Sequence, residues 1–257
     1  MIDVQIQNHL ATLTINRPEA LNALNTALLE ELKKEIQELK QNPEVRCLVI
    51  KGGGDKAFVA GADISEMAEM SQEEAENFGQ FGNEVFELIH HFPAPVIAAV
   101  HGYALGGGFE LALACDLRIA TEKARFAFPE TGLGITPGFG GTQRLARLSN
   151  PALACELIFT GRRLKAEEAL QYGLVNQVCE VEELDEKVKE MADAILSKAP
   201  IALREAKRAI YEGLDGRLAD GLALESKAFA RCFASQDQKD AMSAFLKKEN
   251  FTDFNNR

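Results

Sequence analysis

Three consecutive glycines join an apolar strand to an apolar helix, and this segment constrains the fold more than any other part of the chain. The strand is the run PVIAAV at residues 95–100, the glycines are Gly106, Gly107 and Gly108, and a helix is expected over residues 109–114. A continuous apolar run is typical of a strand buried on both faces, as in parallel sheets. We therefore predict an α/β core with much parallel strand pairing.

Alternating strand and helix patterns fill the first part of the chain. Period-two alternation on both sides of Asn8 and His9 predicts a β-hairpin over residues 4–15. Asn25 is suited to cap the first long helix, because its side chain can accept a hydrogen bond from the first turn. The expected helices here span residues 26–39 and 73–89, and the further strands span residues 46–50, 117–120, 125–128 and 174–178.

After Asn150 the pattern becomes mainly helical. Ala199 precedes Pro200, and a residue before proline is disfavoured in helical geometry, so we expect a joint there. We interpret residues 1–195 as a core and residues 196–257 as a helical appendage. The expected helices span residues 151–159, 166–172, 181–198, 201–213, 218–235 and 238–248.

The charge of the chain excludes one class of partner. A net charge of −11 argues against nucleic-acid binding, which rests on clusters of lysine and arginine. The five cysteines are scattered without a CxxC pair, so the sequence predicts neither a zinc site nor a disulfide framework. No basic leader and no apolar run of about 20 residues is present. We expect a cytoplasmic protein without a membrane span, or a mature mitochondrial chain whose leader was removed.

The glycine run admits three interpretations. Its N–H groups stand at the start of a helix, where the helix dipole favours negative charge. They can cradle a phosphate, form an oxyanion hole, or simply allow close packing between helix and strand. A phosphate cradle is disfavoured because no GK[ST] follows and because Glu110 would stand near the anion.

Two glutamates follow the glycines. Glu110 falls in the first turn of the expected helix, a common placement that also helps to keep a carboxylate ionised, as a general base requires. Glu130 follows Phe126, Phe128 and Pro129, and apolar surroundings would raise its pKa and suit it to proton transfer. The alternative for Glu130 is an exposed loop residue.

Other chemistries have less support. A second turn before a helix contains Gly61 and Ala62, which can present another backbone N–H to a ligand; capping of that helix by Asp63 or Ser65 is the simpler alternative. The four histidines lack the spacing of metal ligands, so no metal site is expected. Neither a GxSxG elbow nor a dinucleotide-binding glycine fingerprint occurs.

Taken together, these segments resemble the enoyl-CoA hydratase (crotonase) family. The similarity covers nearly the whole chain, with several specific motifs in the same order. The matching segments are NRPEALNAL at 16–24, AFVAGADISEM at 57–67, PVIAAVHGYALGGGFELALACD at 95–116, FPETGLGITPGFGGTQRL at 128–145 and FTGRRLKAEEALQYGLVNQV at 159–178.

The resemblance implies a crotonase-like spiral of ββα units with a C-terminal helical region used in trimer formation, and trimers that commonly pair into hexamers. It implies that the N–H groups of Ala62 and Gly107 form an oxyanion hole for a thioester oxygen. Glu110 and Glu130 match the two catalytic glutamates of the hydratases, and Gly138 matches a glycine beside the water site. We expect Glu110 to hold and activate water and Glu130 to exchange the proton at C2.

The resemblance also implies contacts with coenzyme A, which is part of the substrate, so no separate cofactor is expected. The motifs do not fix the far end of the pocket, so acyl preference stays open. Three C-terminal positions match the nucleotide end of the site, and an amphipathic helix face is their alternative. The implied contacts are Ala60, Asp63, Ile64, Ala20, Leu21, Phe229, Phe245 and Lys248.

We therefore predict an enoyl-CoA hydratase, a hydro-lyase of the fatty-acid β-oxidation type that gives 3-hydroxyacyl-CoA from 2-trans-enoyl-CoA. An isomerase of the same family is the near alternative, although two glutamates favour hydration. An RNA-binding member is disfavoured, because residues 28–41 mix acidic and basic side chains rather than forming a basic face. A non-catalytic CoA-binding scaffold is disfavoured by the presence of both glutamates.

Overall fold

The computed structural model describes residues 1–256, which form two compact units. The first unit comprises Met1–Phe92 and Val96–Lys189, and the second comprises Pro93–Pro95 and the chain from Glu190 onward. This division falls within helix α8 (Leu184–Leu196). The boundary proposed from the sequence, after residue 195, falls near the end of the same helix.

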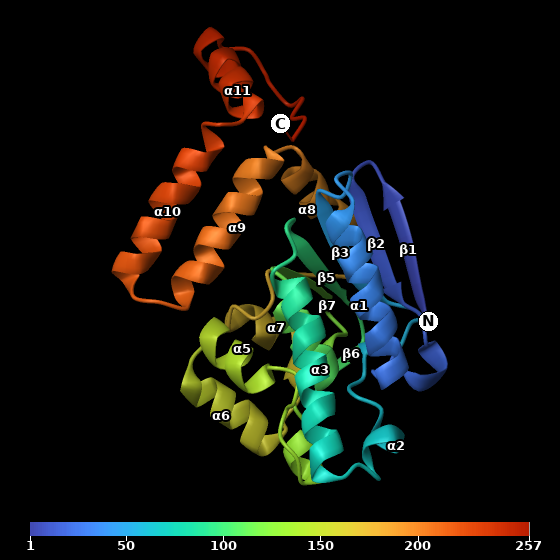
Figure 1. The fold of residues 1–257 in the computed structure, drawn as a ribbon. Helices are drawn as coiled ribbons and strands as arrows, with labels where there is room; N and C mark the ends of the chain where they lie inside the picture. The colour runs from blue at the N-terminus through green and yellow to red at the C-terminus, as the bar shows by residue number, and fades with distance from the viewer. Residues whose placement is uncertain (257) are drawn as a thin grey trace. The chain divides into compact units, whose positions relative to one another are not determined.

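A six-stranded sheet forms the centre of the first unit (Figure 1). All neighbouring strands pair in parallel except the first two, which form an antiparallel hairpin. This confirms the predicted α/β core. The strand order is β1 (Ile2–Gln7), β2 (Leu10–Ile15), β3 (Cys47–Gly52), β5 (Val96–Val100), β7 (Leu117–Thr121) and β10 (Gln177–Cys179).

The hairpin and the two long helices follow the sequence prediction. Asn8 and His9 both adopt positive φ, 50° and 68°, as a tight two-residue turn between twisted strands requires. The Asn25 side chain accepts a hydrogen bond from the Leu28 N–H at 2.9 Å and caps α1 (Thr26–Gln41). Helix α3 (Gln72–His90) begins with a capping box, and α1 and α3 pack against each other.

A second sheet of four short strands was only partly predicted. It contains β4 (Ala57–Val59), β6 (Tyr103–Leu105), β8 (Arg125–Ala127) and β9 (Leu164–Lys165), of which only β8 was expected. Strands of two or three residues are too short to show period-two alternation. Because β4 and β6 pair in parallel, the segments that follow them meet at one edge of this sheet.

Two further expectations were wrong in detail. The last strand was expected over residues 174–178 but spans Gln177–Cys179, because Leu174 and Val175 are buried in the preceding loop. Helix α5 (Gly141–Leu148) was missed, since it begins on glycine and has a polar sequence. The remaining helices of this unit are η1 (Pro18–Ala20), α2 (Ile64–Met67), α4 (Gly107–Ala114), η2 (Glu130–Leu133), α6 (Pro151–Thr160), α7 (Ala166–Gln171) and η3 (Val181–Glu183).

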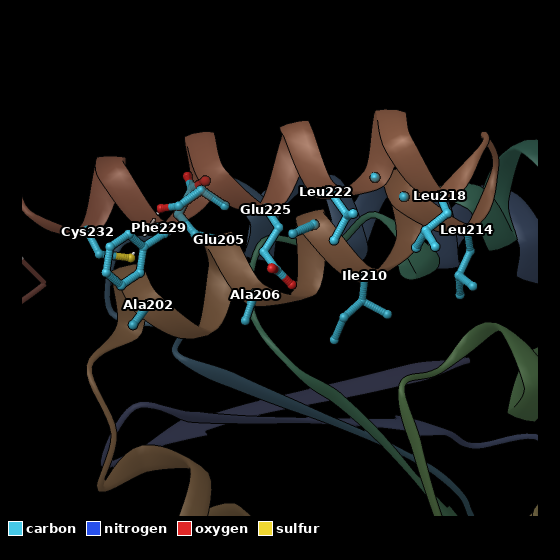
Figure 2. Close-up of a pocket in the computed structure, with 14 residues that line it drawn as sticks. Ala202, Glu205, Ala206, Ile210, Leu214, Leu218, Leu222, Glu225, Phe229 and Cys232 are labelled. Carbon is cyan, nitrogen blue, oxygen red and sulfur yellow. Dashed lines mark hydrogen bonds between the residues drawn. The ribbon is translucent and has the colours of Figure 1, made fainter.

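The second unit is helical, as predicted. Helices α9 (Pro200–Leu214) and α10 (Leu218–Cys232) lie side by side and antiparallel, followed by α11 (Gln236–Lys247) (Figure 1). The pair carries a groove of about 630 Å³ with apolar side chains along it, among them Ile210, Leu222 and Phe229 (Figure 2). None of the helices within residues 1–256 combines the length and the apolar character needed to cross a membrane.

Candidate active site

A cavity of about 700 Å³ in the first unit collects the residues that the sequence singled out. Glu110 and Glu130 both line it, together with Ala62 and Gly107. These four residues come from three segments: Ala62 follows β4, Gly107 and Glu110 belong to α4, and Glu130 opens η2. The lining also includes Ala60, Gly61, Ile64, Met67, Met70, Ala75, Glu76, Gly106, Pro129, Leu133, Ile135, Thr136, Gly138 and Phe139.

Two backbone N–H groups are available at one end of this cavity. Leu24 pairs with the segment around Ala62: the Leu24 N–H donates to the Gly61 carbonyl at 2.8 Å, and the Asp63 N–H donates to the Leu24 carbonyl at 2.7 Å. This pairing turns the Ala62 N–H away from Leu24, since successive N–H groups alternate in extended chain. Gly107 opens α4, so its N–H has no intrahelical acceptor.

These two N–H groups are close neighbours. A Cβ placed on Gly107 would lie 3.5 Å from the Ala62 backbone nitrogen. Within residues 1–256, neither N–H donates a hydrogen bond to the protein. The pair therefore has the composition of an oxyanion hole, two backbone donors beside a cavity.

The positions of the glycine run require glycine for different structural reasons. Gly106 has φ +47°, and a Cβ there would clash with the Glu130 carboxylate. A Cβ on Gly108 would clash with the Val59 carbonyl oxygen, so this glycine permits the close approach of helix and strand. Gly108 thus allows close packing of helix and strand, whereas Gly107 provides the available N–H donor.

Glu110 is fixed by backbone donors. Its side chain is 1% exposed, and its Oε1 accepts hydrogen bonds from the Phe139 N–H at 2.8 Å and the Gly141 N–H at 2.7 Å. Burial raises the pKa of Glu110 to about 6, and the two N–H groups and the charge of Arg144 oppose that rise. Burial thus outweighs the interactions that favour the ionised carboxylate, and the contribution of the helix start stays a prediction.

Glu130 is held more loosely. It opens η2 directly after Phe128 and Pro129, and its Oε2 is buried without a hydrogen-bond partner in the described chain. Burial, and secondarily the charge of Glu110, raise its pKa to about 7. This confirms the predicted effect of apolar surroundings. Two carboxylates in one cavity with different pKa values are suited to separate roles as base and acid.

Only some of the predicted CoA contacts of the first unit lie on the wall of the cavity. Ala60 and Ile64 line the cavity, and the Ala60 N–H donates to the Leu21 carbonyl at 3.0 Å. Asp63 caps α2, and its carboxylate pairs with Arg17 at 2.9 Å. Hydrogen bonds from Ser65 and then Arg17 hold the pKa of Asp63 below its usual value. The Asp63 side chain thus has structural partners, and its backbone N–H already donates to the Leu24 carbonyl.

The three C-terminal candidates, together with Ala20, Leu21 and Asp63, do not line this cavity. Ala20 ends η1, next to Leu21. Phe229 lines the groove of the second unit. Phe245 is 81% exposed on α11, and Lys248 ends that helix in a left-handed conformation. The contacts of these residues with CoA stay predictions.

Sequence reasoning missed three residues that surround Glu110. Phe139 and Gly141 supply its two hydrogen bonds, and Arg144 acts on its charge. The only signal was the glycine-rich run PGFGGTQR, which indicates a tight loop. The loop bonds a carboxylate about thirty residues earlier in the chain. This is a tertiary contact, which a local sequence pattern does not predict.

Comparison with known proteins identifies the family to which this fold and cavity belong. The sequence model described as enoyl-CoA hydratase/isomerase matches residues 5–256. The chain belongs to the enoyl-CoA hydratase/isomerase family.

Several relatives are similar over nearly their full length. The chain is 52% identical to a short-chain-enoyl-CoA hydratase of Clostridium acetobutylicum, covering 98% of this chain and 96% of that protein. It is 51% identical to a crotonyl-CoA hydratase of Syntrophomonas wolfei, covering 96% and 95%. Among solved structures, an enoyl-CoA hydratase from Bacillus anthracis superimposes with a TM-score of 0.95 at 42% identity, covering 100% of this chain and 99% of that one.

Proposed function

We infer that the chain is an enoyl-CoA hydratase, a carbon–oxygen lyase that adds water across the 2,3 double bond of a 2-trans-enoyl-CoA. Family membership and two relatives at about 50% identity that are named hydratases support this activity. The observation that carries it within the structure is the pair of carboxylates, with pKa values near 6 and near 7, in one cavity beside two unpaired backbone donors.

We propose that the thioester oxygen accepts hydrogen bonds from the Ala62 and Gly107 N–H groups. This interaction polarises the conjugated double bond and stabilises the enolate that forms when water adds at C3. One such donor contributes on the order of 100- to 1,000-fold to the rate of an acyl-transfer reaction, which indicates the scale to expect here.

We propose that Glu110 accepts a proton from the attacking water and that Glu130 donates a proton to C2. Glu110 has the lower pKa and is fixed by two backbone hydrogen bonds on Oε1, which leaves Oε2 for the water. Glu130 has the higher pKa and an unpaired buried oxygen. Its proton is therefore available near neutral pH. Because the two groups interact, the titration belongs to the pair.

The substrate also implies the partners of the protein. We propose that the backbone around Ala60 to Ile64, with Ala20 and Leu21, contacts CoA, and that Phe229, Phe245 and Lys248 contact its nucleotide end. Hydration transfers no electrons, so we propose that it needs no cofactor beyond the CoA of the substrate. We propose a cytoplasmic location.

We further propose that the chain assembles as a homotrimer or as a hexamer of two trimers. The apolar groove of α9 and α10 supports contact between copies, because Leu214 is 74% exposed and Leu218 is 78% exposed there (Figure 2). Exposed apolar surface of this kind is typical of a surface that another chain covers.

Ultraviolet absorbance tests the activity directly. Purified protein is mixed with crotonyl-CoA and then with longer enoyl-CoAs, and loss of the conjugated enoyl-thioester absorbance is followed. We expect a decrease that depends on enzyme concentration for at least one acyl length. Constant absorbance at every acyl length would contradict the hydratase function.

A further inference from the structure

The loop of residues 138–141 that holds Glu110 is itself held from two sides. The Asn83 side-chain amide, on α3, donates to the Gly138 carbonyl at 2.8 Å. The Arg144 guanidinium, on α5, donates through Nη1 to the Phe139 carbonyl at 2.9 Å. The same loop directs the N–H groups of Phe139 and Gly141 to Glu110. The orientation of the carboxylate therefore depends on groups that never touch it.

Arg144 occupies a closely fitted position. Its side chain is 11% exposed, and its other terminal nitrogen pairs with Glu87. Gly140 has φ +99°, and a Cβ there would clash with the guanidinium, so Arg144 packs directly over the backbone of the loop. Phe139 packs edge-on against Phe78, with ring centroids 5.2 Å apart, which fixes the loop from its apolar side.

We propose that Arg144 is a positioning residue for the reaction. It fixes the 138–141 loop through the Phe139 carbonyl and places a largely buried positive charge behind Glu110. This inference rests on the proposed role of Glu110 in hydration. It assigns to Arg144 both a geometric and an electrostatic contribution, which different substitutions can separate.

The charge contribution follows from burial. Arg144 stays protonated even though burial lowers its pKa, because a guanidinium titrates far above neutral pH. A positive charge in a partly dry environment favours the ionised form of Glu110, and Arg144 does oppose the rise in the pKa of Glu110.

Other titratable groups around the pair must be considered with it. Strand β4 contributes none, and Tyr103 of β6 faces Arg163 instead. The groups that interact with Glu110, Arg144 or their direct partners are Glu130 of η2, Glu87, His90 and His91 of α3, and Cys115 after α4.

Three substitutions separate charge from geometry. Arg144→Gln removes the charge, and its shorter side chain no longer reaches the Phe139 carbonyl that Nη1 bonds. Arg144→Lys keeps the charge but lacks the planar fork that reaches two acceptors. Arg147→Gln is the matched control, since Arg147 lies one turn further along α5, is exposed, and bonds Gln143 at 3.0 Å.

The pH profile of kcat/KM with crotonyl-CoA is the first readout. We expect Arg144→Gln to move the acidic limb to higher pH and to lower kcat by about 10- to 100-fold, the range for a slightly misplaced catalytic group. We expect Arg144→Lys to lower kcat while its acidic limb stays near that of the wild type. Arg147→Gln should match the wild type in both respects.

The second readout does not require activity. NMR titration of isotopically labelled glutamate carboxyl carbons reports the pKa of Glu110, with the resonance assigned by its loss in Glu110→Gln. We expect the pKa to rise in Arg144→Gln. We expect the pKa of Glu110 to fall in Glu87→Gln, because this substitution removes a negative charge next to Arg144. The Glu87→Gln variant also tests the proposal if Arg144→Gln does not fold.

The two readouts also separate the two proposals. If the wild type fails to hydrate any enoyl-CoA while the titration shifts as expected, the proposed function is wrong but the coupling of Arg144 to Glu110 stands. If the wild type hydrates crotonyl-CoA and folded Arg144→Gln keeps the wild-type titration and acidic limb, then Arg144 is only a structural residue and the inference is overturned.

Discussion

The cavity of the first unit and the groove of the second have similar volumes, about 700 Å³ and about 630 Å³, but opposite chemistry. The cavity contains two carboxylates with raised pKa values and two N–H groups that find no acceptor among residues 1–256. The groove is lined mainly by alanine and leucine from two helices, together with two glutamates, Glu205 and Glu225 (Figure 2). Volume therefore does not distinguish a reaction site, whereas buried polar groups without protein partners do.

In the described part of the single chain, the cavity has a buried polar atom without a hydrogen bond and the groove has apolar side chains exposed to solvent. In the cavity, a buried carboxyl oxygen of Glu130 lacks a hydrogen bond, which costs stability unless water or a ligand supplies one. In the groove, apolar side chains such as Leu218 face solvent, which favours association with another apolar surface. The first observation supports the proposed substrate site and the second supports the proposed assembly.

The largest expected effect comes from removing either carboxylate of the cavity. Glu110→Gln and Glu130→Gln should each lower kcat by about 100- to 10,000-fold, because general acid or base catalysis is lost. Dissociation constants for CoA, measured by calorimetry, should stay close to that of the wild type, since neither side chain is assigned a CoA contact. Near-normal turnover in one variant would show that its carboxylate is not a catalytic group.

A smaller effect is expected from moving Glu110 without removing it. A Cβ on Gly141 would lie 2.9 Å from Glu110 Oε1 and 2.6 Å from Phe128 Cε1, so Gly141→Ala must shift the carboxylate or the loop. We expect kcat to fall by about 10- to 100-fold. Gly132→Ala is the control, because a Cβ there meets nothing within 4 Å. Equal kcat values for the two variants would contradict a requirement for this placement of Glu110.

The rate of hydration should show a narrow, bell-shaped dependence on pH. Hydration needs Glu110 ionised, so the rate rises as pH increases through about 6, and it needs Glu130 protonated, so the rate falls as pH increases beyond about 7. Dehydration needs the opposite state, with Glu110 protonated and Glu130 ionised. Because this state also carries one proton on the pair, its rate should show a bell-shaped pH dependence in the same range. Initial rates in both directions across pH 4–10 test this, and a rate that only rises with pH would contradict it.

The groove prediction concerns assembly rather than chemistry. Leu222→Glu places a charge among the apolar side chains of α9 and α10 and should shift the solution mass toward that of one chain. Ile6→Glu is the control, since Ile6 is exposed on β1 outside the groove. Light scattering after size exclusion measures both. A wild-type mass near one chain would contradict the proposed trimer.

The comparison also shows what sequence can and cannot predict. The hairpin and the long helices were predictable because each has a periodic pattern longer than one turn or pleat, and the strand at Val96–Val100 because it is a continuous apolar run. Strands β4, β6 and β9 were not, since two or three residues become a strand only through their partners. The same limit applies to the site. Glu110 and Glu130 were identified from the chain, whereas the loop that orients Glu110 was not.

The environment of each carboxylate required the fold as well. The apolar residues before Glu130 predicted a raised pKa, and burial is the first cause of the rise. For Glu110 the local helix start suggested an easily ionised group, but burial on all sides of α4 dominates. Local sequence therefore predicts a pKa only where local sequence supplies the surroundings.

The central claim is that the cavity adds water to an enoyl thioester, and isotope labelling of the product tests it most directly. Crotonyl-CoA is incubated with the protein in water enriched in heavy oxygen and deuterium, and the product is analysed by mass spectrometry and NMR. The account predicts heavy oxygen at C3 and one deuterium at C2, with neither label incorporated at a comparable rate by Glu110→Gln or Glu130→Gln. Deuterium incorporation with a shifted double bond and no oxygen label would contradict hydration and indicate an isomerase.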